Sequence, residues 1–114
     1  LGVSHPKLLA VVGFMEHFLE EPLSQTELAQ KASLSTRQLE RLFRKYLSTT
    51  PTRYYLNLRL ARARHLLRQT SMSILSIALA CGFVSASHFS KCYREIYGKT
   101  PRAERTPDTN VAAL

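Results

Sequence analysis

One stretch of the chain occurs twice, fifty residues apart. The sequence "STRQLERLFRKYLSTTP" begins at Ser35, and "SASHFSKCYREIYGKTP" begins at Ser85. Aligned without a gap, the two stretches pair serine with serine, large apolar residues with each other, and Thr-Pro with Thr-Pro at the end. A repeat of this kind predicts one structural unit used twice. The chain of 114 residues is near the usual size of one domain, so we expect one compact body built from two small units.

Apolar residues recur at helical spacing through most of the chain, which predicts helices and no sheet. A first helix should begin at Pro6 and end near Pro22. Short helices are expected at 25–32 and 36–47, and again from Ile74 to Gly82 and from Ser85 to Gly98, with one more turn through Arg105. The fold class is therefore all-α. We expect a first subdomain at 1–51, a linker helix at 52–70, a second subdomain at 71–105 and a disordered tail at 106–114.

Each unit consists of a short helix, a tight turn and a second helix, which is the outline of a helix-turn-helix. Small residues, Ser33 and Gly82, occupy the turns. The positions where the two helices should face each other are apolar or small: Leu28, Ala29, Leu39 and Leu42 in the first unit, and Ile77, Ala78, Phe89 and Cys92 in the second. Cys81 and Cys92 form no paired motif and should pack as small apolar residues, which fits a reducing, cytoplasmic location.

Positive charge is concentrated in the middle of the chain. The net charge is +8, and no acidic residue lies between Arg41 and Arg94. Basic side chains displace the counterions of a polyanion, so this distribution indicates a nucleic acid as ligand rather than a merely soluble surface. The second helix of each unit should leave one face outside, with residues at i, i+4 spacing. This face holds Thr36, Arg37, Glu40, Arg41 and Arg44 in one unit, and Ala86, Ser87, Ser90, Lys91 and Arg94 in the other. Such faces suit the major groove of duplex DNA.

Three stretches of the chain resemble a known family. They read "LSQTELAQKASLSTRQLERLF", "PTRYYLNLRLARARHLL" and "ILSIALACGFVSASHFSKCYREIYGKTPRAER". Together they are similar to the DNA-binding domain of AraC/XylS-type bacterial transcription regulators. The resemblance implies two helix-turn-helix units joined by a linker helix, with both recognition helices in successive major grooves about 34 Å apart. It thus implies sequence-specific binding to double-stranded DNA that carries a bipartite operator.

The same resemblance assigns the candidate contacts. Base contacts fall on Arg37, Glu40 and Arg41 in the first unit, and on Ala86, His88, Ser90 and Lys91 in the second. Phosphate contacts fall on Ser35, Thr36, Arg44, Ser85, Ser87 and Arg94, the serines through free N–H groups at helix starts. Two alternatives stay open. The second unit reads bases or only grips phosphates, and His88 contacts DNA or simply caps and packs its helix.

Three arginines of the expected linker helix could also reach DNA. Of Arg59, Arg62 and Arg64 we expect some to be solvated and Arg59 to be tied to the neighbouring unit.

Other function classes find little support. An enzyme needs a nucleophile, a base and an orienting carboxylate, yet the only aspartate is Asp108 in the expected tail. Four scattered glycines make no phosphate loop, and His5, His17 and His65 lack ligand spacing with the cysteines, so we predict neither cofactor nor metal ion. No apolar run is long enough for a membrane span. A helical adaptor with a basic docking face is the main alternative, followed by single-stranded nucleic-acid binding.

Further expectations concern a longer protein. Because the chain begins with Leu1, we expect it to be a piece of one. The resemblance implies that the full regulator contacts RNA polymerase and dimerises through another domain, while this piece alone is monomeric. The opening "GVSHPKLLAVVGFMEHFLEEPLS" resembles the lead-in of family members with a glutamine-amidotransferase-like sensing domain, some of which respond to quaternary amines or amino acids.

Overall fold

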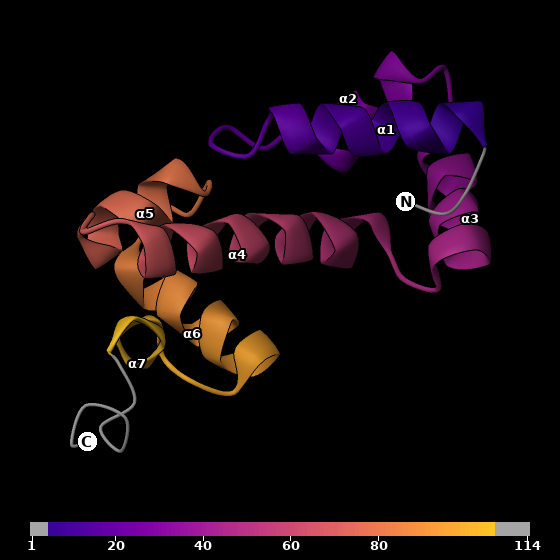
Figure 1. The fold of residues 1–114 in the computed structure, drawn as a ribbon. Coiled ribbons are helices and arrows are strands. Elements are labelled where there is room, and N and C mark those ends of the chain that lie inside the picture. Colours follow the sequence, from indigo (N-terminus) through magenta and orange to yellow (C-terminus); the bar gives the residue numbers. More distant parts are fainter. Residues whose placement is uncertain (1–4, 107–114) are drawn as a thin grey trace. The chain divides into compact units, whose positions relative to one another are not determined.

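The computed structural model describes residues 5–106, and within them every regular element is an α-helix (Figure 1). The all-α prediction is thereby confirmed. The elements are α1 (Pro6–His17), α2 (Gln25–Lys31), α3 (Thr36–Leu47), α4 (Pro51–Gln69), α5 (Ile74–Ala80), α6 (Ala86–Tyr97) and α7 (Pro101–Arg105). Contacts divide the chain into unit 1, Leu1–Leu58, and unit 2, Arg59–Leu114, so the boundary falls inside α4. Apart from Thr106, the expected tail lies outside the described residues.

Serine side chains start four of the helices. Ser24, Ser35, Ser73 and Ser85 each accept a hydrogen bond from the N–H group three residues ahead. In α2 and α3 the cap is reciprocal, because Glu27 and Gln38 reach back to the N–H groups of Ser24 and Ser35. The pKa of the Glu27 carboxylate is lowered because it accepts a hydrogen bond from the backbone N–H group of Ser24.

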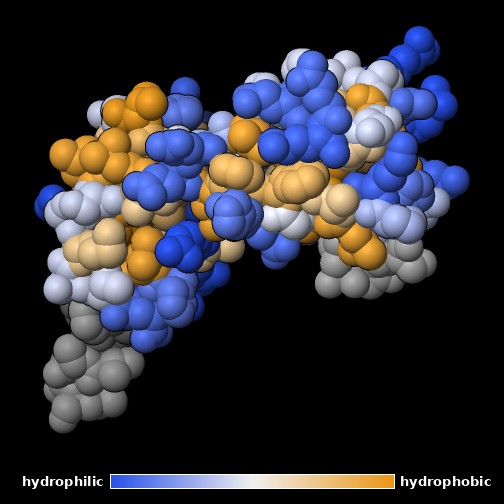
Figure 2. Space-filling view, turned by 90° about the horizontal axis from the view of Figure 1, so that it is seen from above, coloured by the Kyte–Doolittle hydropathy of each residue, from blue (hydrophilic) through white to orange (hydrophobic). Residues whose placement is uncertain are grey.

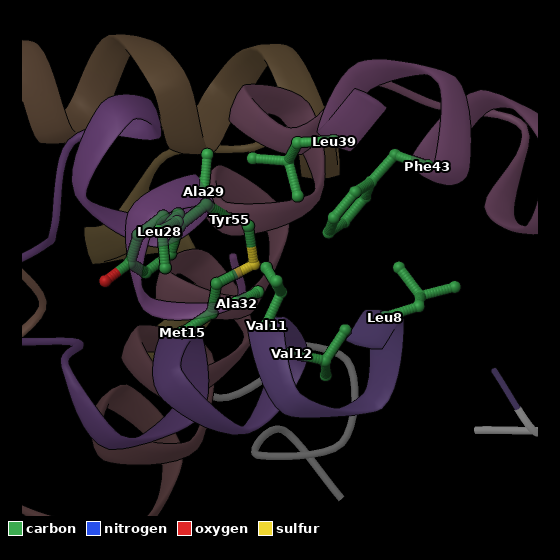
Figure 3. Packing of buried hydrophobic residues seen from close by; sticks show 10 residues of the cluster. All are labelled: Leu8, Val11, Val12, Met15, Leu28, Ala29, Ala32, Leu39, Phe43 and Tyr55. Carbon is green, nitrogen blue, oxygen red and sulfur yellow. The ribbon is translucent and has the colours of Figure 1, made fainter. Parts of the chain in front are cut away.

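Unit 1 is held together by an apolar cluster from all of its helices (Figure 3). Figure 3 shows the side chains of α1 pointing toward Leu39 and Phe43 of α3. The cluster comprises Leu8, Val11, Val12, Met15, Leu28, Ala29, Ala32, Leu39, Phe43 and Tyr55. The predicted inward positions of this unit are confirmed for Leu28, Ala29 and Leu39, whereas Leu42 is only half-buried.

Helix α1 ends earlier than its apolar pattern predicts. The sequence places the end near Pro22, but α1 stops at His17 and Phe18 leaves the helical conformation. The hydroxyl group of Tyr55 explains the difference, because it donates to the carbonyl oxygen of Phe18 and accepts from the N–H group of Leu23 at 3.1 Å. This buried hydroxyl therefore satisfies the polar backbone groups of a loop that would otherwise need helical partners.

The two helix-turn-helix turns are built alike. Ser33 and Gly82 both take the left-handed conformation, with φ of 57° and 84°. The residue after each then donates its N–H group back to the first helix, Leu34 to Ala29 at 2.8 Å and Phe83 to Ala78 at 2.9 Å. Unit 2 has one additional residue before its second helix, the exposed Val84. The first helices of the repeat are therefore offset by 49 residues and the second helices by 50.

Unit 2 has its own core, which includes all four predicted inward positions, Ile77, Ala78, Phe89 and Cys92. Phe89 contacts the rings of Phe83 and Tyr93. Both cysteines are buried, as their apolar surroundings predict, and burial raises the pKa of Cys81 to about 11.

The short helix α7 supplies a buried carboxylate to unit 2. Glu104 accepts a hydrogen bond from the Tyr93 hydroxyl at 2.7 Å. Three cations surround the carboxylate at 2.9 to 3.1 Å: Arg64, Arg68 and Lys99. Burial by itself raises the pKa of Glu104, but the hydrogen bonds and the nearby positive charges outweigh it and lower the pKa to about 2. Burial and the hydrogen bond to Glu104 raise the pKa of Tyr93.

Arg105 completes the attachment of α7. Its guanidinium group donates to the carbonyl oxygens of Leu67 at 3.2 Å, Met72 at 2.5 Å and Thr70 at 3.3 Å. These carbonyl oxygens lie at the end of α4 and just beyond it, where helix geometry offers no N–H partner. Arg105 therefore satisfies the end of α4 within unit 2.

Candidate nucleic-acid interface

The outer face of α3 is strongly basic. Arg41 lies two residues after Leu39 and two before Phe43, both fully buried, so at roughly 100° per residue it points away from the core. Arg37 and Arg44 lie on the same side, and all three arginines are exposed. None of the three forms an ion pair with another described residue. The structure thus brings the predicted arginines of the first unit together on one solvent-exposed face.

A further cation, Arg53, joins this surface at the far end of α3. A hollow there is lined by Arg44, Ser48, Thr49, Thr50 and Arg53. Arg53 was not among the predicted contacts because it belongs to the next helix, α4, and lacks the i, i+4 relation to the others. The sequence did hold a signal for this contact. Thr50 and Pro51 mark a helix start only a few residues after α3 ends, so Arg53, in the first turn of α4, lies close to Arg44.

The carboxylate on this face is held by a neighbouring helix. Gln25, the first residue of α2, donates from its Nε2 atom to Oε1 of Glu40 at 2.8 Å. Both side chains belong to unit 1. Gln25 was not singled out from the sequence, because its partner lies 15 residues away and no local pattern links them.

The corresponding face of α6 is smaller and less charged. Lys91 lies two residues after Phe89 and two before Tyr93, so it points away from the core of unit 2 as Arg41 does in unit 1. Ser87, Lys91 and Arg94 are exposed, and Ala86 and Ser90 are half-buried. The sequence of α3 holds four cations and one carboxylate, whereas that of α6 holds two cations and one carboxylate. Helix α3 therefore carries more positive charge than α6.

His88 is exposed, as Lys91 is, but its ring also packs within unit 2. Its ring meets the edge of Phe83, with centroids 5.7 Å apart, and its Nε2 atom lies 3.5 Å from Sγ of Cys92. The N–H group of His88 donates to the Ser85 hydroxyl at 3.1 Å. Of the two readings open for this residue, the contacts favour capping and packing.

The serines at the helix starts differ in detail from the expectation. The N–H group of Ser35 donates to Oε1 of Gln38 at 2.9 Å, so it is not the free donor that the sequence predicts. The Ser35 hydroxyl accepts from the Gln38 N–H group, as that of Ser85 does from His88. Donors toward an anion at the start of α3 are therefore the hydroxyl hydrogen of Ser35 and the next N–H groups, of Thr36 and Arg37.

Several cations of the acid-free stretch are occupied inside unit 2. Arg59 donates to the carbonyl oxygens of Cys81 and Gly82, each at 2.8 Å, and stacks on Phe83. This confirms its predicted structural role. Arg64 and Arg68 pair with Glu104, a partner that the sequence did not reveal. Nε of Arg64 lies 3.0 Å from the carboxylate without hydrogen-bond geometry, so charge attraction holds that contact.

Hydrophilic residues predominate on the face shown in Figure 2, with smaller hydrophobic groups between them. Among residues 5–106, no cluster of three or more histidine, cysteine or acidic side chains could hold a metal ion. No helix in that part of the chain has both the length and the hydropathy needed to cross a membrane.

Comparisons with known proteins agree with this geometry. The family described as "Helix-turn-helix domain" matches residues 28–106. The transcriptional regulator GbdR of Pseudomonas aeruginosa is 61% identical over 105 residues, which cover 92% of this chain and 29% of GbdR. ArgR of the same species is 55% identical over 105 residues, which cover 92% of this chain and 32% of ArgR. The chain thus spans about a third or less of these relatives.

Solved structures extend the comparison. An AraC-type transcriptional regulator from Chromobacterium violaceum superposes with a TM-score of 0.84 at 57% identity, covering 88% of this chain and 89% of that one. The DNA-binding domain of AdpA, solved in complex with a target DNA, gives 0.82 at 29% identity, covering 87% and 89%. These matches bear out the resemblance read from the sequence. The chain belongs to the AraC-type family of helix-turn-helix transcription regulators.

Proposed function

We propose that this chain is the DNA-binding domain of a transcription regulator and binds duplex DNA through the outer faces of α3 and α6. The observation that carries the proposal is the repeated geometry of these helices. In each, a cation stands opposite a buried pair of large side chains, Arg41 opposite Leu39 and Phe43, and Lys91 opposite Phe89 and Tyr93. The complex of the related AdpA domain with its target DNA supports the same assignment.

In unit 1 we assign base reading to Arg37, Glu40 and Arg41. An arginine can donate two hydrogen bonds to O6 and N7 of guanine, and a glutamate can accept from N4 of cytosine. All three side chains are exposed and lie on the outer face of α3. Unit 1 should therefore supply most of the sequence preference.

In unit 2 we assign base reading to Lys91, with Ala86 and Ser90 as short contacts. Lysine can donate to guanine, and small side chains can meet a thymine methyl group. We leave His88 out of this set because its ring packs on Phe83 and Cys92.

Phosphate contacts are proposed for Ser35, Thr36, Arg44 and Arg53 in unit 1, and for Ser85, Ser87 and Arg94 in unit 2. Arg44 and Arg53 line one hollow together with three hydroxyl-bearing residues, which suits the oxygens of a phosphodiester group. Phosphate contacts set the register of the protein on the duplex, and base contacts then give the sequence preference.

At the level of the whole regulator, the proposal is an activator that works in the cytoplasm on a bipartite operator. RhaS of Escherichia fergusonii, named a transcriptional activator, is 37% identical over 99 residues, which supports that role. Two recognition helices in one chain suit successive major grooves, so this piece can bind as a monomer. We also propose that the full regulator contacts RNA polymerase, dimerises, and carries an amidotransferase-like sensing domain.

Selection of binding sites from random duplexes of about 30 base pairs tests the proposal. Two short motifs with centres about one helical turn apart are expected if both helices read bases. A single motif would reduce unit 2 to a phosphate clamp. The adaptor function would be favoured instead by two results together: no duplex is enriched, and plain duplex DNA does not displace an acidic protein that is bound to this chain.

A further inference from the structure

The hydrogen bond from Gln25 to Glu40 links the two helices of the first helix-turn-helix on the solvent side. Its length of 2.8 Å lies in the usual range for a hydrogen bond to an ionised carboxylate. One oxygen of Glu40, Oε1, is occupied by Gln25, and the carboxylate keeps acceptor capacity on its other oxygen. A glutamate on an exposed helix face usually samples several rotamers, so this bond selects one of them.

The competing partner of Glu40 lies on its own helix. Arg44 stands four residues further along α3, and a glutamate followed by an arginine at this spacing is the favourable order for an ion pair. Yet no ion pair joins Glu40 to Arg44 or Arg37 in the described part of the chain. The Glu40 carboxylate therefore bonds to Gln25 and pairs with neither arginine.

The second unit serves as an internal comparison. The residues at the corresponding positions are Ile74, the first residue of α5, and Ser90 on α6. Neither can form an amide-to-carboxylate bond. Both line a hollow in unit 2, together with Ala86, Thr100, Pro101 and Arg102. The chain therefore contains the same helix pair once with the link and once without it.

We propose that Gln25 is a positioning residue for base recognition: it holds the Glu40 carboxylate in one orientation, with one oxygen directed to a base amino group and both neighbouring arginines left for DNA. The inference rests on the proposed function, in particular on base reading by Glu40. A held acceptor loses less conformational freedom when it binds, which sharpens the distinction between a base that offers an amino group and one that does not. Cytosine N4 and adenine N6 are the groups of this kind in the major groove.

The test compares four variants with the unchanged chain: Gln25→Ile, Glu40→Ala, both together, and Thr26→Ala as control. Isoleucine is the residue that unit 2 carries at this position, so it suits the start of a short helix. Thr26 is exposed and lies next to Gln25 on α2. For each variant, site selection locates the base position whose preference Glu40→Ala removes. Anisotropy titrations then give the ratio of dissociation constants between the best and the worst base there.

Gln25→Ile should lower this ratio about three- to tenfold, a part of the discrimination that one good side-chain pair supplies. In the Glu40→Ala background the same substitution should change nothing, because the group it positions is absent. Thr26→Ala should leave the ratio unchanged. Melting temperatures of all variants should stay close to that of the unchanged chain, which separates positioning from folding.

Two results would overturn the inference. One is an unchanged ratio in Gln25→Ile although Glu40→Ala abolishes the preference, which would leave the proposed function intact. The other is an equal effect of Gln25→Ile with and without Glu40. If Glu40→Ala itself removed no base preference, or if no variant bound duplex DNA, the proposed function would fail first and the inference with it.

Discussion

Replacing Glu104 by glutamine should destabilise unit 2 through charge alone. Glutamine keeps the shape of the side chain and can still accept from the Tyr93 hydroxyl, but it removes the negative charge that faces Arg64, Arg68 and Lys99. The Glu104 side chain is only 2% exposed. The three cations would then face one another around a neutral group that water hardly reaches.

The pKa of Glu104 sets the size of the effect. A fall from the ordinary 4.5 to about 2 corresponds to about 3 kcal/mol of stabilisation of the charged form. Removing one partner of a fully buried pair costs about 3 to 5 kcal/mol. Here the cations are 37 to 49% exposed, so water screens them in part. We expect a loss of about 2 to 4 kcal/mol at neutral pH.

The pH dependence has a definite sign. The folded pKa lies below the unfolded one, so the stabilisation is fully present above about pH 4.5 and is lost as the pH falls toward 2. The difference between the unchanged chain and Glu104→Gln should therefore be largest at neutral pH. It should shrink steadily on acidification below pH 4.5.

Amide hydrogen exchange of the α6 peptides, measured with increasing urea, reports the free energy of opening of unit 2 by itself. Glu95→Gln is the matched control, because Glu95 is an exposed carboxylate at the end of the same helix and forms no ion pair with a described residue. A loss below about 0.5 kcal/mol in Glu104→Gln, or an equal loss in Glu95→Gln, would refute the reasoning.

Three further outcomes are expected. Leu39→Ala should destabilise by about 2 to 5 kcal/mol, whereas the half-exposed Leu75→Ala should not, and unchanged melting of the first would mean that α3 faces the other way. Arg59→Ala should cost about 2 kcal/mol because two carbonyl oxygens lose their donor, and equal melting of Arg59→Ala and the exposed Arg62→Ala would contradict this. A plot of the logarithm of the DNA-binding constant against the logarithm of salt concentration should have a slope near −5, because about six phosphates are neutralised. A slope near −1 would contradict that number of phosphate contacts.

Features that depend on neighbours along the chain were predictable. Ser35 caps α3 because a serine followed by glutamine at the third helical position offers a reciprocal pair of hydrogen bonds. Leu39 and Phe43 face inward because apolar residues four apart share one side of a helix. The same periodicity placed Arg41 outside.

Features that depend on distant partners were not predictable. Glu104 stands between arginines in the sequence, yet it pairs with Arg68, 36 residues away, and with Tyr93. Tyr55 ends α1 through a hydroxyl that meets Phe18 from 37 residues away. In both cases one side chain of ordinary appearance satisfies groups that only the fold brings near. The link from Gln25 to Glu40 escaped prediction for the same reason.

The central claim, that each unit reads its own half of the operator, is tested most directly by Arg41→Ala and Lys91→Ala on the selected duplex. Base preferences in each half are measured by titrating single-base variants of that duplex. Arg41→Ala should cost about 1 to 3 kcal/mol of binding and relax the preference in one half only, and Lys91→Ala should relax it in the other half. Equal weakening on every sequence by either variant would contradict base reading by that unit.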